Sequence, residues 1–317
     1  MPDRTLRRHI PELDGLRGAA IVLVLFYHYC YLTDLAQPPN LFTRLGRSFG
    51  LGWAGVDLFF VLSGFLIGGI LLDARTSPLY FRTFYARRFF RIVPLYYLWI
   101  GIYFVLTLSR FSIYLKQVGG VPEEFSIVPI YALFVQNMTR NLHSSFGTAW
   151  LAALWSLAVE EQFYLFMPLA VRFLTRRRLS LLLLTAVFGS PIVRILVFRV
   201  STAHAIQYML APCRADALSM GVLLAIGWRN EVWKARVLNH RKVLFGVTLL
   251  LFSAVVYIGY AAPSPYSFTM TVWGFSTIDC FFSCLLLTVL LVPQGFAGRI
   301  FGGLFSWNSA RFLTVSM

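Results

Sequence analysis

The chain has 317 residues, of which 58% are hydrophobic and only 13% are charged, and its mean hydropathy is +0.70. A soluble domain is closer to half apolar and a quarter charged, so this composition excludes an ordinary soluble enzyme and indicates an integral membrane protein. The net charge of +15 does not indicate nucleic-acid binding, because the basic residues cluster between apolar segments, as in the cytoplasmic loops of membrane proteins.

The apolar segments have the length and periodicity of transmembrane helices and lack the short alternating pattern of an outer-membrane barrel. We therefore predict an all-α fold, a polytopic bundle of transmembrane helices. No small-residue cleavage site follows the first apolar segment, so it is a helix with a cytoplasmic amino end and not a signal peptide. The four cysteines lack the spacing of a zinc site or a disulfide framework, and we expect no metal.

The predicted spanning helices number about eight and cover residues 14–33, 53–73, 92–109, 150–174, 179–199, 206–228, 243–261 and 268–292. The run from Phe125 to Met138 is shorter than the ~20 residues that a span needs, and Pro129 interrupts it. We interpret it as a short re-entrant or interfacial segment on the outer side. Both chain ends are then cytoplasmic, as are the basic clusters at 75–91, 176–178 and 229–242. We expect a single membrane-embedded domain over residues 1–317.

The first predicted helix carries two side chains that are costly in hydrocarbon, Arg17 and His28. Their spacing is close to three helical turns, so both lie on one helix face, roughly 16 Å apart along the axis. Arg17 would lie near the cytoplasmic surface and His28 inside the membrane. A functional pair is one explanation; the other is that Arg17 extends to the headgroups while His28 binds a neighbouring helix.

Two further clusters follow. In GVDLFFVLSGFLIG, Asp57 lies near the outer end of the second helix, and the small residues after it, such as Gly64, permit close helix packing. In RRFFRIVPLYY, Arg88 and Arg91 are three positions apart at a predicted helix start before Pro94. Two guanidinium groups so spaced could hold a phosphate; a basic loop that touches anionic lipid is the alternative.

The fourth helix contains LWSLAVEEQFY, in which Ser156 and Glu160 are one turn apart. Glu161 directly follows Glu160, and two adjacent carboxylates at membrane depth favour a functional role over packing. In the sixth helix, Arg214 and Asp216 of RADALSMG are expected to form an internal pair, which could be structural. Our candidates for substrate binding are Arg214, Asp216 and Ser156.

These motifs, in this order over residues from about 11 to 292, resemble the integral-membrane acyltransferase-three family. The resemblance implies a bacterial O-acyltransferase of the inner (plasma) membrane that modifies surface polysaccharides and related acceptors. It implies a cytoplasmic acyl-CoA co-substrate, most often acetyl-CoA, with no bound cofactor, and a carbohydrate or lipid-linked glycan as acceptor. It also implies that Arg17 and His28 are essential and that Arg88 and Arg91 form the family's arginine pair.

The family has a further helix that is entered through a motif of the form SYxIYLxH. This chain stops at ARFLTVSM, where that helix should begin. We therefore expect the last one or two helices of the family's domain to be missing.

Acyl transfer from a thioester to a hydroxyl needs a base that deprotonates the acceptor. We expect His28 to be this general base, with Glu160 or Asp57 orienting its ring. His28 could equally carry the acyl group itself as a relay, and the sequence does not separate these two mechanisms.

The CoA phosphates would bind to Arg88 and Arg91, with help from Arg17. Two other classes of function compete with this interpretation. A carrier for an anionic solute could use the same arginines, although transporters usually show internal repeats and we find none. The other competitor is a membrane scaffold without catalytic activity.

Overall fold

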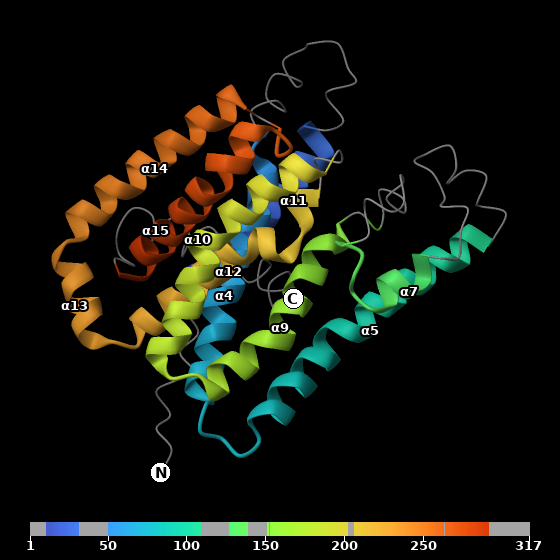
Figure 1. Ribbon diagram of the computed structural model, residues 1–317, viewed down its shortest axis with the longest axis horizontal. Helices are drawn as coiled ribbons and strands as arrows, with labels where there is room; N and C mark the ends of the chain where they lie inside the picture. The colour runs from blue at the N-terminus through green and yellow to red at the C-terminus, as the bar shows by residue number, and fades with distance from the viewer. Residues whose placement is uncertain are drawn as a thin grey trace. The chain divides into compact units, whose positions relative to one another are not determined.

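The computed structural model describes residues 11–31, 50–108, 127–138, 151, 153–201, 206–262 and 264–291. All regular elements in these ranges are helices, which confirms the predicted all-α fold (Figure 1). In chain order they are α1 (Pro11–Phe26), α4 (Gly55–Asp73), α5 (Tyr80–Leu108), α7 (Ile127–Ala132), α9 (Leu154–Phe173), α10 (Arg176–Val200), α11 (Ile206–Met209), α12 (Ala211–Trp228), α13 (Glu231–Asn239), α14 (Arg241–Ala261) and α15 (Phe275–Leu291). Short turns of other helix types cover Tyr27–Tyr31, Gly52–Ala54 and Met270–Gly274.

Six of these segments are long and apolar enough to cross a membrane: Gly52–Asp73, Tyr80–Leu106, Arg176–Val200, Ile206–Trp228, Arg241–Ala261 and Met270–Leu291. Each corresponds to a predicted span. The other two predicted spans correspond to α1 and α9, whose polar residues lower their mean hydropathy. The six segments show a multi-pass helical membrane protein, and the count of eight stays a prediction.

The basic residues before Pro94 lie on a helix, whereas we expected most of them in a loop. α5 begins at Tyr80 and continues through Arg88, Arg91 and Pro94 to Leu108. Its first turns contain Tyr80 and Tyr85, whose hydroxyl groups donate hydrogen bonds to carbonyls of α9. A further helix, α13, lies within the basic stretch 229–242, where we predicted a loop. Within the described residues 127–138, the helix of the predicted short segment is the six-residue α7, which agrees with a segment too short to span.

The chain forms two compact units. The central unit comprises residues 67–216, and the terminal unit comprises residues 1–66 together with 217–317. The division falls within α4 and within α12.

In the terminal unit, glycines allow α4 and α12 to approach to backbone contact. A Cβ atom on Gly64 would lie 2.9 Å from the carbonyl carbon of Leu218, and one on Gly221 would lie 2.8 Å from the Cα of Gly64. Both distances are far below a normal van der Waals contact. Small residues at such crossings are typical of membrane helices, and the position of Gly64 confirms the packing role predicted for it.

This crossing gives a test of the fold. We expect Gly64→Ala to lower the free energy of unfolding by about 1–3 kcal/mol, because the added methyl group forces two backbones apart. Thermal unfolding in detergent micelles would measure the loss. Gly101→Ala on α5 is the matched control, because no atom lies within 4 Å of a Cβ at that position. A Gly64→Ala variant as stable as this control would contradict the close packing.

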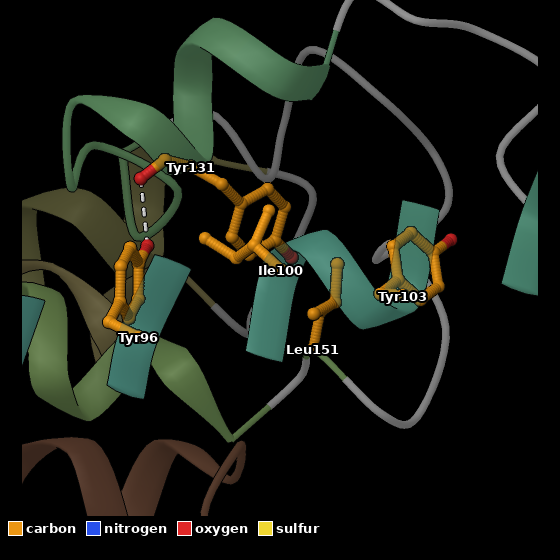
Figure 2. Close-up of a cluster of buried hydrophobic side chains, with 5 residues drawn as sticks. All are labelled: Tyr96, Ile100, Tyr103, Tyr131 and Leu151. Carbon is orange, nitrogen blue, oxygen red and sulfur yellow. Dashed lines mark hydrogen bonds between the residues drawn. The ribbon is translucent and has the colours of Figure 1, made fainter. Parts of the chain in front are cut away.

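In the central unit, the hydroxyl groups of four α5 tyrosines hold α5 against its neighbours. Each donates a hydrogen bond of 2.7–3.1 Å to a backbone carbonyl of α9 or α7: Tyr80 to Pro168, Tyr85 to Leu165, Tyr96 to Tyr131 and Tyr97 to Ala132. Figure 2 shows the hydrogen bond between Tyr96 and Tyr131 inside a buried cluster. The cluster is formed by Tyr96, Ile100, Tyr103, Tyr131 and Leu151. These contacts fix α5 beside the polar residues of α9.

Candidate active site

His28 lies in a π-helical turn, Tyr27–Tyr31, that directly follows α1. Such turns are rare and occur frequently at functional sites. The ring is exposed, and its Nδ1 atom lies 2.8 Å from the carbonyl oxygen of Val24. Because a carbonyl oxygen only accepts hydrogen bonds, this contact requires the proton on Nδ1. In the neutral ring, Nε2 then carries the lone pair, which is the state that a base or a nucleophile needs.

The start of α4 packs against this turn of α1. A Cβ on Gly52 would lie 2.9 Å from the Cβ of Tyr27, and one on Gly55 would lie 2.9 Å from a methyl carbon of Val24. The two glycines therefore permit close approach beside His28. Asp57, in the first turn of α4, is completely buried, and its negative charge is favourable at a helix amino terminus.

Arg17 lies in the amino-terminal half of α1, eleven positions before His28. Its Nη1 atom lies 3.3 Å from Oδ1 of Asp14, one turn earlier, and its side chain is 31% exposed. This distance is longer than that of a strong charge-assisted hydrogen bond. The pair is therefore a weak one, of the kind that can yield to a more strongly bound anion.

In the central unit, Tyr164 connects two of the predicted site residues. The guanidinium carbon of Arg88 lies over the Tyr164 ring, 5.0 Å from its centroid, and the Tyr164 hydroxyl donates a 3.0 Å hydrogen bond to Oε2 of Glu160. Arg88 on α5 and Glu160 on α9 thus belong to one cluster. We did not select Tyr164 from the sequence, although its i,i+4 spacing from Glu160 is the signal that marks it.

The segment after α7 holds α9 through a pair of side-chain amides. Gln162 donates to Oδ1 of Asn137 at 2.8 Å and to the carbonyl of Phe134 at 2.8 Å. Asn137 donates in return to Gln162 at 3.2 Å and to the carbonyl of Met209 at 3.3 Å. These four hydrogen bonds link α9 to the segment after α7 and to α11. The rotation of α9, and with it the direction of Glu160, is fixed by this pair.

Phe134 adopts an unusual backbone conformation, with φ of 55°. It ends α7 in a Schellman motif, in which the N–H of Phe134 bonds to the carbonyl of Tyr131 and that of Val135 to Ile130. Glycine is the usual residue at this position. The Phe134 ring stacks on Tyr96, with centroids 4.1 Å apart, and this contact offsets the strain.

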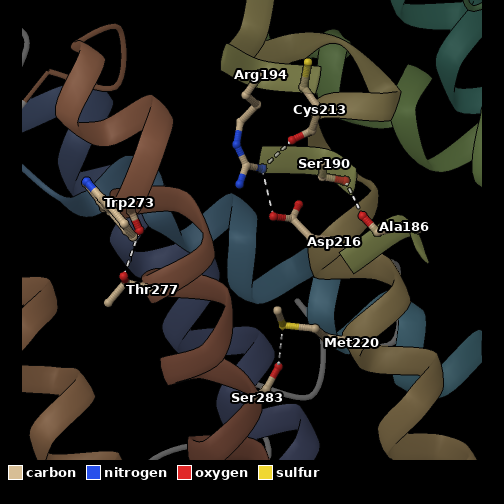
Figure 3. A network of polar contacts seen from close by, with 9 residues as sticks. All are labelled: Ala186, Ser190, Arg194, Cys213, Asp216, Met220, Trp273, Thr277 and Ser283. Carbon is tan, nitrogen blue, oxygen red and sulfur yellow. Dashed lines mark hydrogen bonds and ion pairs between the residues drawn. The ribbon is translucent and has the colours of Figure 1, made fainter. Parts of the chain in front are cut away.

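Figure 3 shows Asp216 paired with Arg194 of α10. The Nη1 and Oδ2 atoms are 2.8 Å apart, both side chains are completely buried, and Arg194 also donates to the carbonyl of Cys213 at 2.6 Å. We expected Asp216 to pair with Arg214, and the structure adds Arg194, from a different helix, as a partner of Asp216. Arg214 is buried with its guanidinium over the Tyr208 ring, at 5.7 Å. Arg194 was missed, although a charge within the apolar run SPIVRILVF marks it.

Ser156 donates a hydrogen bond to the carbonyl of Ala153 at the start of α9. This local contact belongs to the helix end. Its predicted role in substrate binding stays a prediction.

The structure distributes the nine predicted site residues over both units. Those in the terminal unit are Arg17, His28 and Asp57, and those in the central unit are Arg88, Arg91, Ser156, Glu160, Arg214 and Asp216. Arg91 is exposed on α5, three positions from Arg88 and so on the same side of that helix. Within the described ranges, no three His, Cys, Asp or Glu side chains gather as metal ligands.

Comparison with known proteins identifies the family. A family model described as an acyltransferase domain matches residues 10–309. The chain is 32% identical over 234 residues to the peptidoglycan O-acetyltransferase OatA of Listeria monocytogenes, an alignment that covers 71% of this chain and 35% of that protein. It is 29% identical over 232 residues to the O-acetyltransferase OatA of Staphylococcus aureus, covering 70% and 35% of the two chains.

The chain thus spans about a third of the length of these two relatives. No solved structure matches it. The family match extends over nearly the whole chain and agrees with the helical membrane fold and the order of the motifs. This chain belongs to the acyltransferase-three family of membrane enzymes that transfer acyl groups.

Proposed function

We propose that this protein transfers an acetyl group from acetyl-CoA to a hydroxyl of a cell-surface glycan. Two relatives are O-acetyltransferases, and one of them is named for peptidoglycan, so peptidoglycan is the acceptor that we propose. The donor is expected at the cytoplasmic face of the inner membrane, where the amino terminus also lies. The observation that carries the proposal is the match of the acyltransferase family model over residues 10–309, and the hydrogen bond between His28 and Val24 supports a role for His28.

That hydrogen bond supports His28 as the general base. With its proton on Nδ1, the ring can accept the acceptor's hydroxyl proton at Nε2 while the acceptor oxygen attacks the thioester carbonyl carbon. The carbon–sulfur bond then breaks, and the imidazolium returns the proton to the departing thiolate, giving an acetyl ester and CoA. The contact with the Val24 carbonyl supports one orientation of the ring, and the roles of Glu160 and Asp57 beside it stay predictions. An acetyl relay would use the same Nε2 lone pair for direct attack on the thioester.

The geometry of α5 supports phosphate binding by Arg88 and Arg91. A guanidinium group contacts an aromatic ring through its face, and its N–H donors point outward in its own plane. Stacking on Tyr164 therefore orients Arg88 without using those donors. Arg91, on the same side of α5, would add a second pair of donors for the CoA phosphates.

The test is CoA release from acetyl-CoA by the full chain reconstituted in lipid vesicles, with and without a soluble peptidoglycan fragment. We expect release that rises on adding the fragment, together with acetyl ester recovered on the glycan. A carrier or a scaffold would leave the thioester intact. Intact acetyl-CoA in a sample that binds CoA would therefore contradict the proposed function.

A further inference from the structure

The structure assigns Tyr164 a role in the reaction: we infer that it is a positioning residue that couples the donor-binding arginine Arg88 to the carboxylate of Glu160. This inference rests on the proposed function. Tyr164 is only 3% exposed, and it contacts Arg88 with its ring and Glu160 with its hydroxyl. It therefore joins a cation on α5 to an anion on α9.

Both contacts belong to the same rigid side chain. The edge of the Phe84 ring packs against Tyr164, with centroids 6.3 Å apart and planes at 81°, so the phenol is held from the side. A buried tyrosine hydroxyl usually finds a hydrogen-bond partner, and here the partner is an acid. At 3.0 Å this hydrogen bond is longer than the strongest bonds from a hydroxyl to a carboxylate, and it favours one rotamer of Glu160.

The two contacts also influence each other. A cation over the ring attracts its electrons and makes the hydroxyl a stronger donor to Glu160. A phosphate bound to Arg88 would offset part of that cation's charge and weaken this effect. Binding at Arg88 and the state of Glu160 are then linked, and such linkage acts in both directions.

Tyr164→Phe separates the two contacts, because it keeps the ring and removes only the hydroxyl. We expect kcat for acetyl transfer to fall about tenfold, with KM for acetyl-CoA unchanged within about twofold. Tyr164→Leu also removes the ring, and we expect it to raise KM for acetyl-CoA and weaken CoA binding about fivefold. Equilibrium dialysis would measure that binding independently of turnover.

Tyr85→Phe is the matched control. Tyr85 also lies on the α5–α9 contact, and its hydroxyl donates to a backbone carbonyl, that of Leu165 at 3.1 Å. We expect this variant to keep kcat and KM within about twofold, because no charged group depends on its hydroxyl.

The outcomes separate this inference from the proposed function. Wild-type protein that transfers acetyl groups, with Tyr164→Phe equally active, would overturn the coupling alone. Variants that lower only the unfolding temperature, with normal kinetics for the folded protein, would assign Tyr164 a structural role and also overturn it. A wild-type chain that neither binds CoA nor releases it from acetyl-CoA would overturn both.

Discussion

A His28→Asn variant is expected to lose about 100- to 10,000-fold in kcat for acetyl transfer, the range that a general base contributes. The asparagine amide nitrogen can donate to the Val24 carbonyl as Nδ1 of His28 does, so the turn after α1 keeps its hydrogen bond. Only the Nε2 lone pair is lost. CoA release from reconstituted vesicles would measure the rate, and thermal unfolding would verify that the variant is folded.

The chain offers a matched control for this substitution. Nδ1 of His240 lies 2.8 Å from the carbonyl of Arg236, four residues earlier, and the ring is exposed. This is the same contact as that of His28 at a place without proposed chemistry. We expect His240→Asn to keep kcat within about twofold. If His28→Asn behaved like His240→Asn, the base would have to be another residue and the proposed mechanism would be wrong.

The helical membrane fold could be predicted because its signals lie within each segment of the sequence. Length, hydropathy and the position of basic clusters depend on about 20 consecutive residues, and they located six spans without reference to the rest of the chain. The same reasoning placed Gly64 at a helix crossing. It placed the start of α5 too late, because the arginine-rich segment before residue 92 was assigned to a basic loop, whereas α5 begins at Tyr80.

The side-chain types of the candidate site could be predicted, but most of their partners could not. Glu160 was selected because a carboxylate at membrane depth is costly, and this cost is a property of the residue itself. Its link to Arg88 through Tyr164 depends on how α5 lies beside α9. Likewise, Gln162 meets Asn137 from a segment 25 positions away. Such pairs arise from tertiary packing and leave no spacing signal.

The pair of Asp216 and Arg194 is a second case in which the sequence indicates that a partner exists but does not identify it. The cost of a buried charge indicates that a partner must exist, so a pairing role for Asp216 was predictable. The participation of Arg194 was not, because Arg194 comes from a different helix, 22 positions earlier. Both arginines lie in apolar segments and are completely buried, and only the structure distinguishes their contacts.

Replacing Arg194 should have a large effect on stability. We expect Arg194→Met to lower the free energy of unfolding by about 3–5 kcal/mol, because it removes the cation that contacts the buried Asp216 carboxylate while leaving that charge in place. The variant also loses the hydrogen bond to the Cys213 carbonyl at the start of α12. Thermal and denaturant unfolding in detergent would measure the loss. Arg199→Met is the control on the same helix, because Arg199 is exposed and we expect a change within about 0.5 kcal/mol.

The double variant Arg194→Met with Asp216→Leu tests the cause. If the loss arises from a buried charge that has lost the Arg194 guanidinium, removing both charges should make the double variant more stable than either single variant, since apolar side chains can replace a buried ion pair at little cost. If the two losses simply add, Arg194 and Asp216 act independently and the ion pair does not hold α10 to α12. The distance of 2.8 Å and the complete burial of both side chains favour strong coupling, because charges in such close contact and away from water interact strongly. The packing of α10 against α12 is then stable when both charges are present or when both are absent.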